Sequence, residues 1–260
     1  MARFSAAALA AASLLLLLTG CAADSRSGSS SAPGSGLHGQ LRIFAAASLH
    51  TSFDEIAADF ERQNPGVDIL PIVYDGSRTL VTQLIEGAAA DVFAAADEKS
   101  MADATDAGLA AAPRLFATNT LVIAVPAGNP AGVRGLADLA DPDLDVVLCA
   151  AEVPCGAAAQ TLLADRDVTV RPASYEQNVT AVLTKVAAGE ADAGLVYATD
   201  VQGRADVEGI VPDGAEDAVN RYPIAALADA ANPDAAAAFV DFVRGRAGQS
   251  VLRARGFGEP

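Results

Sequence analysis

The sequence is poor in tryptophan, in other aromatic residues and in histidine, and these shortages limit what the protein can be. It has no tryptophan, aromatic residues make up 5% of its 260 residues, and it contains 2 histidines. The core must therefore consist mostly of alanine, valine, leucine and isoleucine. Basic residues are also scarce, with 17 Lys and Arg against 33 Asp and Glu, and the formal net charge is -16. Such an acidic chain is a poor candidate for binding nucleic acid or anionic lipid through charge.

The shortage of histidine also argues against an enzyme with a serine nucleophile, because that nucleophile needs a base close by. His38 falls in a segment rich in serine and glycine, and His50 follows Ser48 on a predicted helix and points away from it. The sequence contains no Gly-x-Ser-x-Gly elbow, no Walker phosphate loop and no His-Glu-x-x-His run. We therefore expect a protein that is not an enzyme and that carries neither a cofactor nor a resident metal.

The first forty residues indicate an export leader followed by a tether. Arg3 supplies a short positive region, residues 6–18 are apolar, and the sequence Leu-Thr-Gly-Cys ends at Cys21. This pattern predicts a signal peptide at residues 1–20 that is too short to be a membrane span. Its ending resembles the bacterial lipoprotein box, which implies cleavage before Cys21 and acylation of that thiol; an ordinary signal peptide is the alternative. Residues 21–40 are rich in serine and glycine, which predicts a flexible tether.

Two cysteines, Cys149 and Cys155, remain in the part of the chain that would be exported. Export favours oxidation, and a pair so close in sequence can bridge a tight loop, so we predict a disulfide between them. Two buried thiols or a metal-binding pair are the alternatives. No histidine clusters near the two cysteines, which argues against zinc.

Apolar segments with strand character alternate with helical patterns from residue 41 onward. Strands are expected at residues 41–48, 67–73, 91–95, 121–125, 145–149, 168–170, 193–197 and 222–227. Helices are expected to follow Ser48, Ser77, Asp97, the turn Pro154-Cys155-Gly156, Asn178 and Asn232. This alternation favours an α/β fold with mostly parallel strands covered by helices on both faces.

Four of the predicted helix starts, at Ser48, Ser77, Cys155 and Val179, suggest a site for an anion. The first N–H groups of a helix lack intrahelical partners, and the helix dipole places positive charge there. Ligands of open α/β sheets bind outside the carboxyl ends of the strands, near such helix starts. Helix starts that face each other across a cleft would suit an oxyanion with several equivalent oxygens. The alternative is that each serine simply caps its helix.

An ordered set of short motifs runs from residue 41 to the C-terminal region. The motifs are Phe44-Ala45-Ala46-Ala47-Ser48-Leu49, Gly76-Ser77-Arg78-Thr79-Leu80, Ala90-Asp91-Val92-Phe93, Val153-Pro154-Cys155-Gly156, Asn178-Val179, Gly194-Leu195-Val196-Tyr197, Arg221-Tyr222-Pro223-Ile224-Ala225 and Gly256-Phe257. Taken together, they resemble the molybdate-binding proteins of bacterial ABC importers.

This resemblance implies an α/β fold of the two-lobed periplasmic-binding type, type II-like, in which each lobe is a mostly parallel sheet flanked by helices. Lobe 1 would comprise residues 41–119 and 223–260, and lobe 2 residues 120–222. The two crossings between the lobes would act as hinges that close on molybdate or tungstate.

The resemblance also implies the residues that hold the oxyanion. They are Ser48 and Ser77 through hydroxyl and N–H groups, Cys155 and Val179 through backbone N–H groups, and Tyr197 through its phenol. The family often carries alanine at the position of Cys155, a change that a backbone donor tolerates. Tyr197 could otherwise be an ordinary core tyrosine with a satisfied hydroxyl.

The implied function is a lipid-anchored extracytoplasmic receptor on the outer face of the cell membrane. It would bind molybdate or tungstate as a monomer and deliver it to an ABC transporter permease, touching the membrane through its lipid alone and binding no nucleic acid. A receptor for sulfate or another tetrahedral oxyanion is the alternative, and an exported serine hydrolase is a remote one. A site built only of donors disfavours a phosphate that still carries a proton, because its O–H would lack an acceptor.

Overall fold

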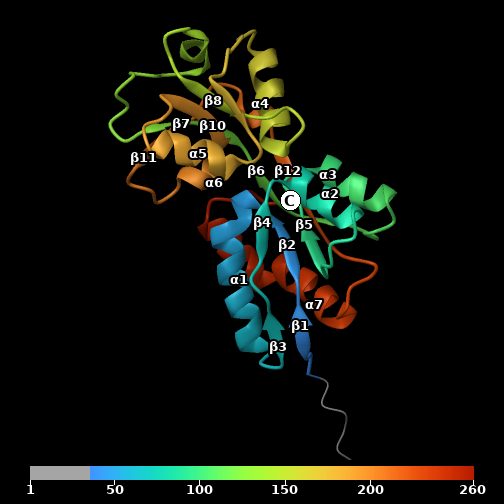
Figure 1. The fold of residues 1–260 in the computed structure, drawn as a ribbon. Helices are drawn as coiled ribbons and strands as arrows, with labels where there is room; N and C mark the ends of the chain where they lie inside the picture. Colours follow the sequence, from blue (N-terminus) through green and yellow to red (C-terminus); the bar gives the residue numbers. More distant parts are fainter. Residues whose placement is uncertain (1–35) are drawn as a thin grey trace, which may run out of the picture. The chain divides into compact units, whose positions relative to one another are not determined.

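The computed structural model describes residues 36–260 (Figure 1). The predicted signal peptide and the predicted lipidation site Cys21 lie outside these residues. Gly36–Pro260 form one unit by their internal contacts. None of the helices in this part of the chain is long and apolar enough to cross a membrane.

Within the described residues, two five-stranded sheets form the scaffold (Figure 1). The first has the order β4 (Val73–Asp75), β2 (Ile43–Ala46), β5 (Val92–Ala94), β12 (Asn220–Ala226) and β6 (Arg114–Asn119). The second has the order β11 (Val207–Ile210), β7 (Leu121–Pro126), β10 (Ala193–Tyr197), β8 (Val146–Cys149) and β9 (Ser174–Glu176). A separate parallel pair joins β1 (Gly39–Leu41) and β3 (Val67–Ile69).

Both sheets are mostly parallel, and each contains a strand that runs against its neighbours. In the first sheet β2 pairs in parallel with β4 and β5, while β12 is antiparallel to β5 and β6. In the second sheet β8 pairs in parallel with β9 and β10, while β7 is antiparallel to β10 and β11. The reversed strands β7 and β12 are those that follow the crossings between the sheets. The predicted α/β fold with mostly parallel sheets is confirmed.

Helices and short 3-10 turns follow most strands. The helices are α1 (His50–Gln63), α2 (Ser77–Ile85), α3 (Glu98–Asp106), α4 (Pro154–Asp165), α5 (Val179–Ala187), α6 (Ala198–Val201), α7 (Pro233–Arg244) and α8 (Arg246–Ala254). The 3-10 turns are η1 (Ala47–Leu49), η2 (Leu136–Ala140) and η3 (Ala215–Asp217). The predicted caps Asp97, Asn178 and Asn232 each accept a hydrogen bond from a backbone N–H of the first helical turn, which confirms those helix starts.

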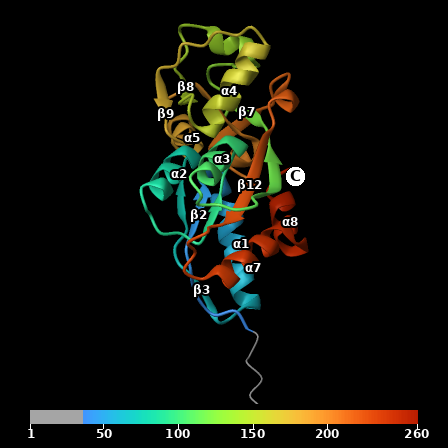
Figure 2. The same cartoon turned by 90° about the vertical axis from the view of Figure 1, so that its right-hand side faces the viewer.

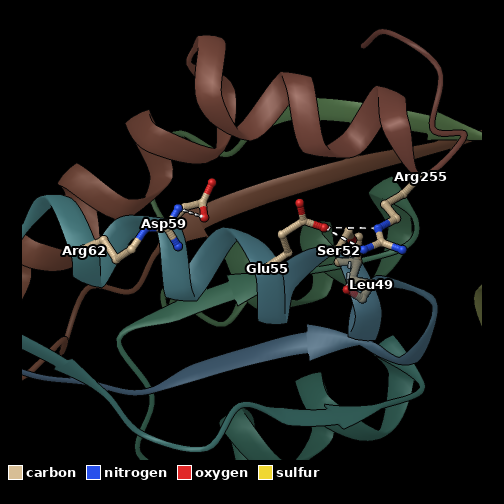
Figure 3. A network of polar contacts seen from close by, with 6 residues as sticks. All are labelled: Leu49, Ser52, Glu55, Asp59, Arg62 and Arg255. Carbon is tan, nitrogen blue, oxygen red and sulfur yellow. Dashed lines mark hydrogen bonds and ion pairs between the residues drawn. The ribbon is translucent and has the colours of Figure 1, made fainter.

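The C-terminal helices pack on the lobe that contains the first sheet. Helix α7 lies beside β12 (Figure 2), and both α7 and α8 contact α1. Phe53 and Phe60 of α1 are buried and meet the ring of Phe239 from α7 edge to face. At the surface of this packing, Arg255 donates to Glu55 through Nε at 3.2 Å and Nη2 at 2.7 Å (Figure 3). The last two helices, α7 and α8, therefore hold α1 in place by apolar contacts and by this ion pair.

Some local predictions were wrong. Residues 168–170 form no strand, and pairing with β8 begins instead at Ser174, after Pro172, which has no N–H to donate. Helix α4 begins at Pro154 rather than after the Pro-Cys-Gly turn, because proline suits the first helical position. Strand β12 begins at Asn220, before the lobe boundary expected at Pro223. Residues 220–222 therefore already belong to the first sheet.

Candidate functional site

A small pocket lies where strand ends and helix starts of the two sheets meet. It is lined by Ala46, Ala47, Ser48, Asp75, Gly76, Ser77, Ala96, Val153, Pro154, Cys155, Asn178, Val179 and Tyr197. The five residues expected to hold an oxyanion, Ser48, Ser77, Cys155, Val179 and Tyr197, are thus brought to one place. The pocket is small, with about 230 Å³ of empty space when its open mouth is included.

Helix starts from both sheets supply the pocket wall. Ser48 lies in η1 directly after β2, and Ser77 is the first residue of α2 after β4. From the second sheet, Cys155 lies in the first turn of α4 after β8, and Val179 begins α5 after β9. The first-turn N–H groups of α2, α4 and α5 need partners from outside their helices. The positive ends of these helix dipoles therefore meet at the carboxyl edges of both sheets.

Both serine hydroxyls are hydrogen-bonded within the protein, and Ser77 accepts, which leaves its own hydrogen free. Ser77 Oγ accepts from Ala96 N at 2.9 Å and does not cap α2. Ser48 Oγ shares a hydrogen bond of 3.0 Å with Tyr222 Oη, which itself lies 3.5 Å from the donor Nδ2 of Asn119. Either hydroxyl can be the donor in the bond between Ser48 and Tyr222, so Ser48 keeps its hydrogen for the pocket only when Tyr222 donates to it. The simple capping role for these two serines is wrong.

Tyr197 brings a donor that lacks a protein acceptor. Its side chain is 1% exposed, and among residues 36–260 its Oη has no hydrogen-bond partner. Burial, followed by the nearby Tyr222, raises the pKa of Tyr197 well above its usual value, so the phenol keeps its proton. Buried tyrosine hydroxyls normally find a partner. The Tyr197 O–H therefore lies in the pocket wall as a donor that a bound anion can accept from.

Asp200 holds the end of the strand that carries this phenol. Its Oδ2 accepts a hydrogen bond from Tyr197 N at 2.8 Å. The side chain keeps some surface exposure, yet the surrounding protein removes most water from the carboxyl group. Burial is the main cause that raises the pKa of Asp200 from 3.8 to about 7, opposed by the hydrogen bond from Tyr197 N. Part of the Asp200 population is therefore neutral near neutral pH.

Asp200 should make the stability of the fold depend on pH. Because its pKa is raised in the folded state, that state holds the proton more tightly than the unfolded state does. The stability contributed by this proton is full below about pH 4 and is lost as the pH rises through about 7. An amide at this position stays neutral and still accepts from Tyr197 N. We therefore expect Asp200→Asn to raise Tm by about 2–6 °C at pH 8 and by little at pH 4.

Thermal unfolding at the two pH values checks this expectation. Asp229→Asn is the matched control, because Asp229 is exposed in a loop and its replacement removes the same charge. The control should shift Tm by a similar small amount at both pH values. An equal gain of Asp200→Asn at both pH values would contradict the role given to burial.

Cys149 and Cys155 are joined, with their sulfur atoms 2.07 Å and their Cα atoms 5.8 Å apart. Both residues are 3% exposed. The bond ties the end of β8 to the first turn of α4. Within residues 36–260, no group of three or more His, Cys, Asp or Glu side chains is placed to hold a metal ion.

The structure adds a carboxylate that the sequence motifs did not indicate. Asp75 lines the pocket, where its Oδ1 accepts hydrogen bonds from Gly76 N at 2.7 Å and Asn178 Nδ2 at 2.8 Å. The pocket therefore contains a carboxylate beside the residues expected to hold the anion. The sequence Tyr74-Asp75-Gly76-Ser77 favours a turn, but Tyr74 and Asp75 extend β4, and this places the Asp75 side chain at the pocket.

A pocket at the facing strand ends of two α/β sheets, lined by hydroxyls and helix starts, defines a two-lobed solute-binding protein. Residues 41–258 match the family model of the bacterial extracellular solute-binding proteins, and the chain belongs to this family. It is 42% identical over 255 residues to the molybdate-binding protein ModA of Mycobacterium tuberculosis, covering 97% of each chain. It is 28% identical over 243 residues to ModA of Escherichia coli, covering 84% of this chain and 89% of that protein. The resemblance carried by the motifs is confirmed.

Solved structures share the fold. The periplasmic molybdate-binding protein of Azotobacter vinelandii matches with a TM-score of 0.69 at 20% identity, over 85% of this chain and 99% of that chain. The sulfate-binding protein SubI of Mycobacterium tuberculosis matches with a TM-score of 0.68 at 20% identity, over 85% of this chain and 86% of that chain. Family membership makes the protein an extracytoplasmic transport receptor rather than an enzyme, in agreement with the prediction from the sequence.

Proposed function

We propose that this protein binds molybdate or tungstate in the pocket between its two sheets and delivers it to the permease of an ABC transporter. It acts as a monomer, held at the outer face of the cell membrane by a lipid on Cys21. The observation that carries the proposal is the orphaned hydroxyl of Tyr197 among converging donors from both sheets. The identity of 42% with a protein named molybdate-binding supports the same anion.

The chemistry of the pocket fits a tetrahedral dianion. Such an ion accepts hydrogen bonds and donates none. The hydroxyls of Ser48, Ser77 and Tyr197 line the pocket and can each donate to an anion, and the first-turn N–H groups at Cys155 and Val179 would add donors from the second sheet. The formal net charge of -16 opposes the anion at long range. Salt screens distant charges over about 8–10 Å, while these donors act at contact.

A receptor for sulfate is the second candidate, and the sulfate-binding SubI has the same fold. Sulfate has the same charge and shape as molybdate, so the donors alone do not separate the two ions. The size of the closed cavity must do so. Isothermal titration with molybdate, tungstate, sulfate and phosphate tests the choice. We expect molybdate and tungstate to bind at least about 100-fold more tightly than sulfate, or about 2.7 kcal/mol; comparable affinity for sulfate would overturn the molybdate assignment.

Removing either pocket hydroxyl should weaken oxyanion binding. We expect Ser48→Ala and Ser77→Ala each to cost about 1.5–3 kcal/mol of binding free energy, the range for a hydrogen bond to a charged group. Isothermal titration with molybdate measures the loss. Thr82→Ala is the control, since Thr82 is an exposed hydroxyl residue on the same helix as Ser77 and bonds to Arg78 O. Unchanged affinity in both serine variants would show that the anion binds elsewhere.

A further inference from the structure

A carboxylate and an amide meet across the pocket, one from each sheet. Asp75 ends β4, and Asn178 follows β9 as the cap of α5. Asp75 Oδ1 accepts a hydrogen bond from Asn178 Nδ2 at 2.8 Å. Both residues line the pocket, but neither belongs to the set of donors assigned to the anion. The contact therefore joins the two halves of the site directly.

This contact lies far from the hinges in the strand order. β4 and β9 are edge strands of their sheets. The chain crosses between the sheets from β6 to β7 and again before β12, and β6 and β12 lie at the opposite end of the first sheet from β4. A rotation about the crossings moves the remote edges most. If the lobes open about these crossings, a hydrogen bond between the remote edges would be broken, and it would form again on closure.

Each partner is oriented by a bond within its own half before the two meet. Asn178 Oδ1 accepts from Ala181 N at 3.0 Å, which leaves Nδ2 pointing outward as a donor. Asp75 Oδ1 accepts from Gly76 N at 2.7 Å, which fixes the carboxylate. Closing the contact then costs little further side-chain entropy. A hydrogen bond to a charged acceptor with oriented partners stabilises more than a neutral one.

The charge of Asp75 acts in the opposite direction. A carboxylate in the wall of a pocket for a dianion repels that ion. If Asp75 acted through charge alone, its removal would tighten binding. If it acts through the bond to Asn178, its removal weakens binding, because the closed form loses a contact. The two effects have opposite signs and can be separated by mutation.

We propose that Asp75 and Asn178 form an interlobe latch that raises the affinity for the oxyanion by stabilising the closed form. The latch rests on the proposed function, because it needs an oxyanion that selects the closed lobes. Asp75 and Asn178 are positioning residues, since they act through closure and not as donors to the anion. The latch raises the affinity only if the bond between Asp75 and Asn178 is present in the closed form and absent from the open form.

The test compares four variants by isothermal titration with molybdate. Asp75→Ala and Asn178→Ser each remove the latch, and serine still caps α5 without adding charge. Each should weaken binding roughly 10-fold. The double variant should be no more than about 3-fold weaker than Asp75→Ala, because the second change removes a bond already lost. Asp75→Asn should bind within about 3-fold of the wild type, since an amide oxygen still accepts from both donors.

Selectivity and folding provide the controls. The ratio of molybdate to sulfate affinity should stay the same in every variant, because the latch does not select between anions. Thermal unfolding without ligand should confirm that Asn178→Ser folds like the wild type. Unchanged or tighter binding by Asp75→Ala, or binding by Asp75→Asn as weak as that of Asp75→Ala, overturns the latch alone. A wild type that binds none of the four oxyanions overturns the proposed function and the latch together.

Discussion

Replacing Gly76 by alanine is expected to weaken oxyanion binding by more than about 100-fold, or about 2.7 kcal/mol, while the ligand-free protein stays as stable as the wild type. A Cβ at Gly76 would lie 2.3 Å from the carbonyl oxygen of Gln177. Gly76 lies on the first sheet's side of the pocket and Gln177 on the second's, so under the proposed hinge closure the clash arises when the lobes close. The φ angle of Gly76 is -58°, which alanine adopts without strain. The cost therefore falls on the closed form.

Two measurements check the expected effect of Gly76→Ala. Isothermal titration gives the loss of affinity, and small-angle scattering with saturating molybdate should find the variant more extended than the liganded wild type. Gly135→Ala is the matched control, because Gly135 has extended backbone and a Cβ there would meet no atom within 4 Å. Wild-type affinity in Gly76→Ala would mean that the lobes do not approach each other at this point during binding.

The positions of the pocket residues follow from local patterns. Ser77 and Val179 each stand at the start of a helix that comes after a strand, and the spacing of apolar residues is enough to predict both junctions. In sheets with mostly parallel strands, such junctions lie at the carboxyl edge. Local chemistry therefore predicts that these residues share an edge. The resemblance to a family adds which residues from the second sheet face them.

Contacts between segments far apart in the chain are not contained in local patterns. The bond between Asp75 and Asn178 joins residues 103 positions apart, and the bond between Ser48 and Tyr222 joins residues 174 positions apart. Periodicity and capping rules describe neighbours within a few residues. The carboxylate at the pocket and the bond between Ser48 and Tyr222 therefore emerge only when the two sheets and the returning strand β12 are in place.

Short strands were the least predictable elements. β9 has 3 residues, and its middle residue Tyr175 is 60% exposed. The alternating residues Val168 and Val170 have a stronger strand pattern, but the segment that pairs with β8 lies after Pro172. Pairing and the missing N–H of proline thus outweigh hydrophobic alternation.

Replacing Gly156 by alanine is expected to have the largest effect on folding. A Cβ there would lie 1.8 Å from Ala150 O, 2.5 Å from Ala150 C and 2.8 Å from Cys149 O. These are backbone atoms of the loop that the Cys149–Cys155 disulfide ties to the start of α4. The loop cannot move away without straining that link. We expect a loss of about 3 kcal/mol or more in the free energy of unfolding, and a fall in Tm of about 6–12 °C.

A cycle of variants separates the effect of the clash from the effect of the disulfide. Without the disulfide, as in Cys149→Ala with Cys155→Ala, the loop can shift away from the added methyl group, so Gly156→Ala should cost less in that background. Thermal unfolding measures both costs, and thiol titration reports whether Gly156→Ala still forms the disulfide. Equal costs in both backgrounds would mean that packing of the loop, and not the disulfide, holds Ala150 against α4. A smaller cost without the disulfide would make the disulfide the reason that position 156 accommodates only glycine, next to Cys155 in the pocket wall.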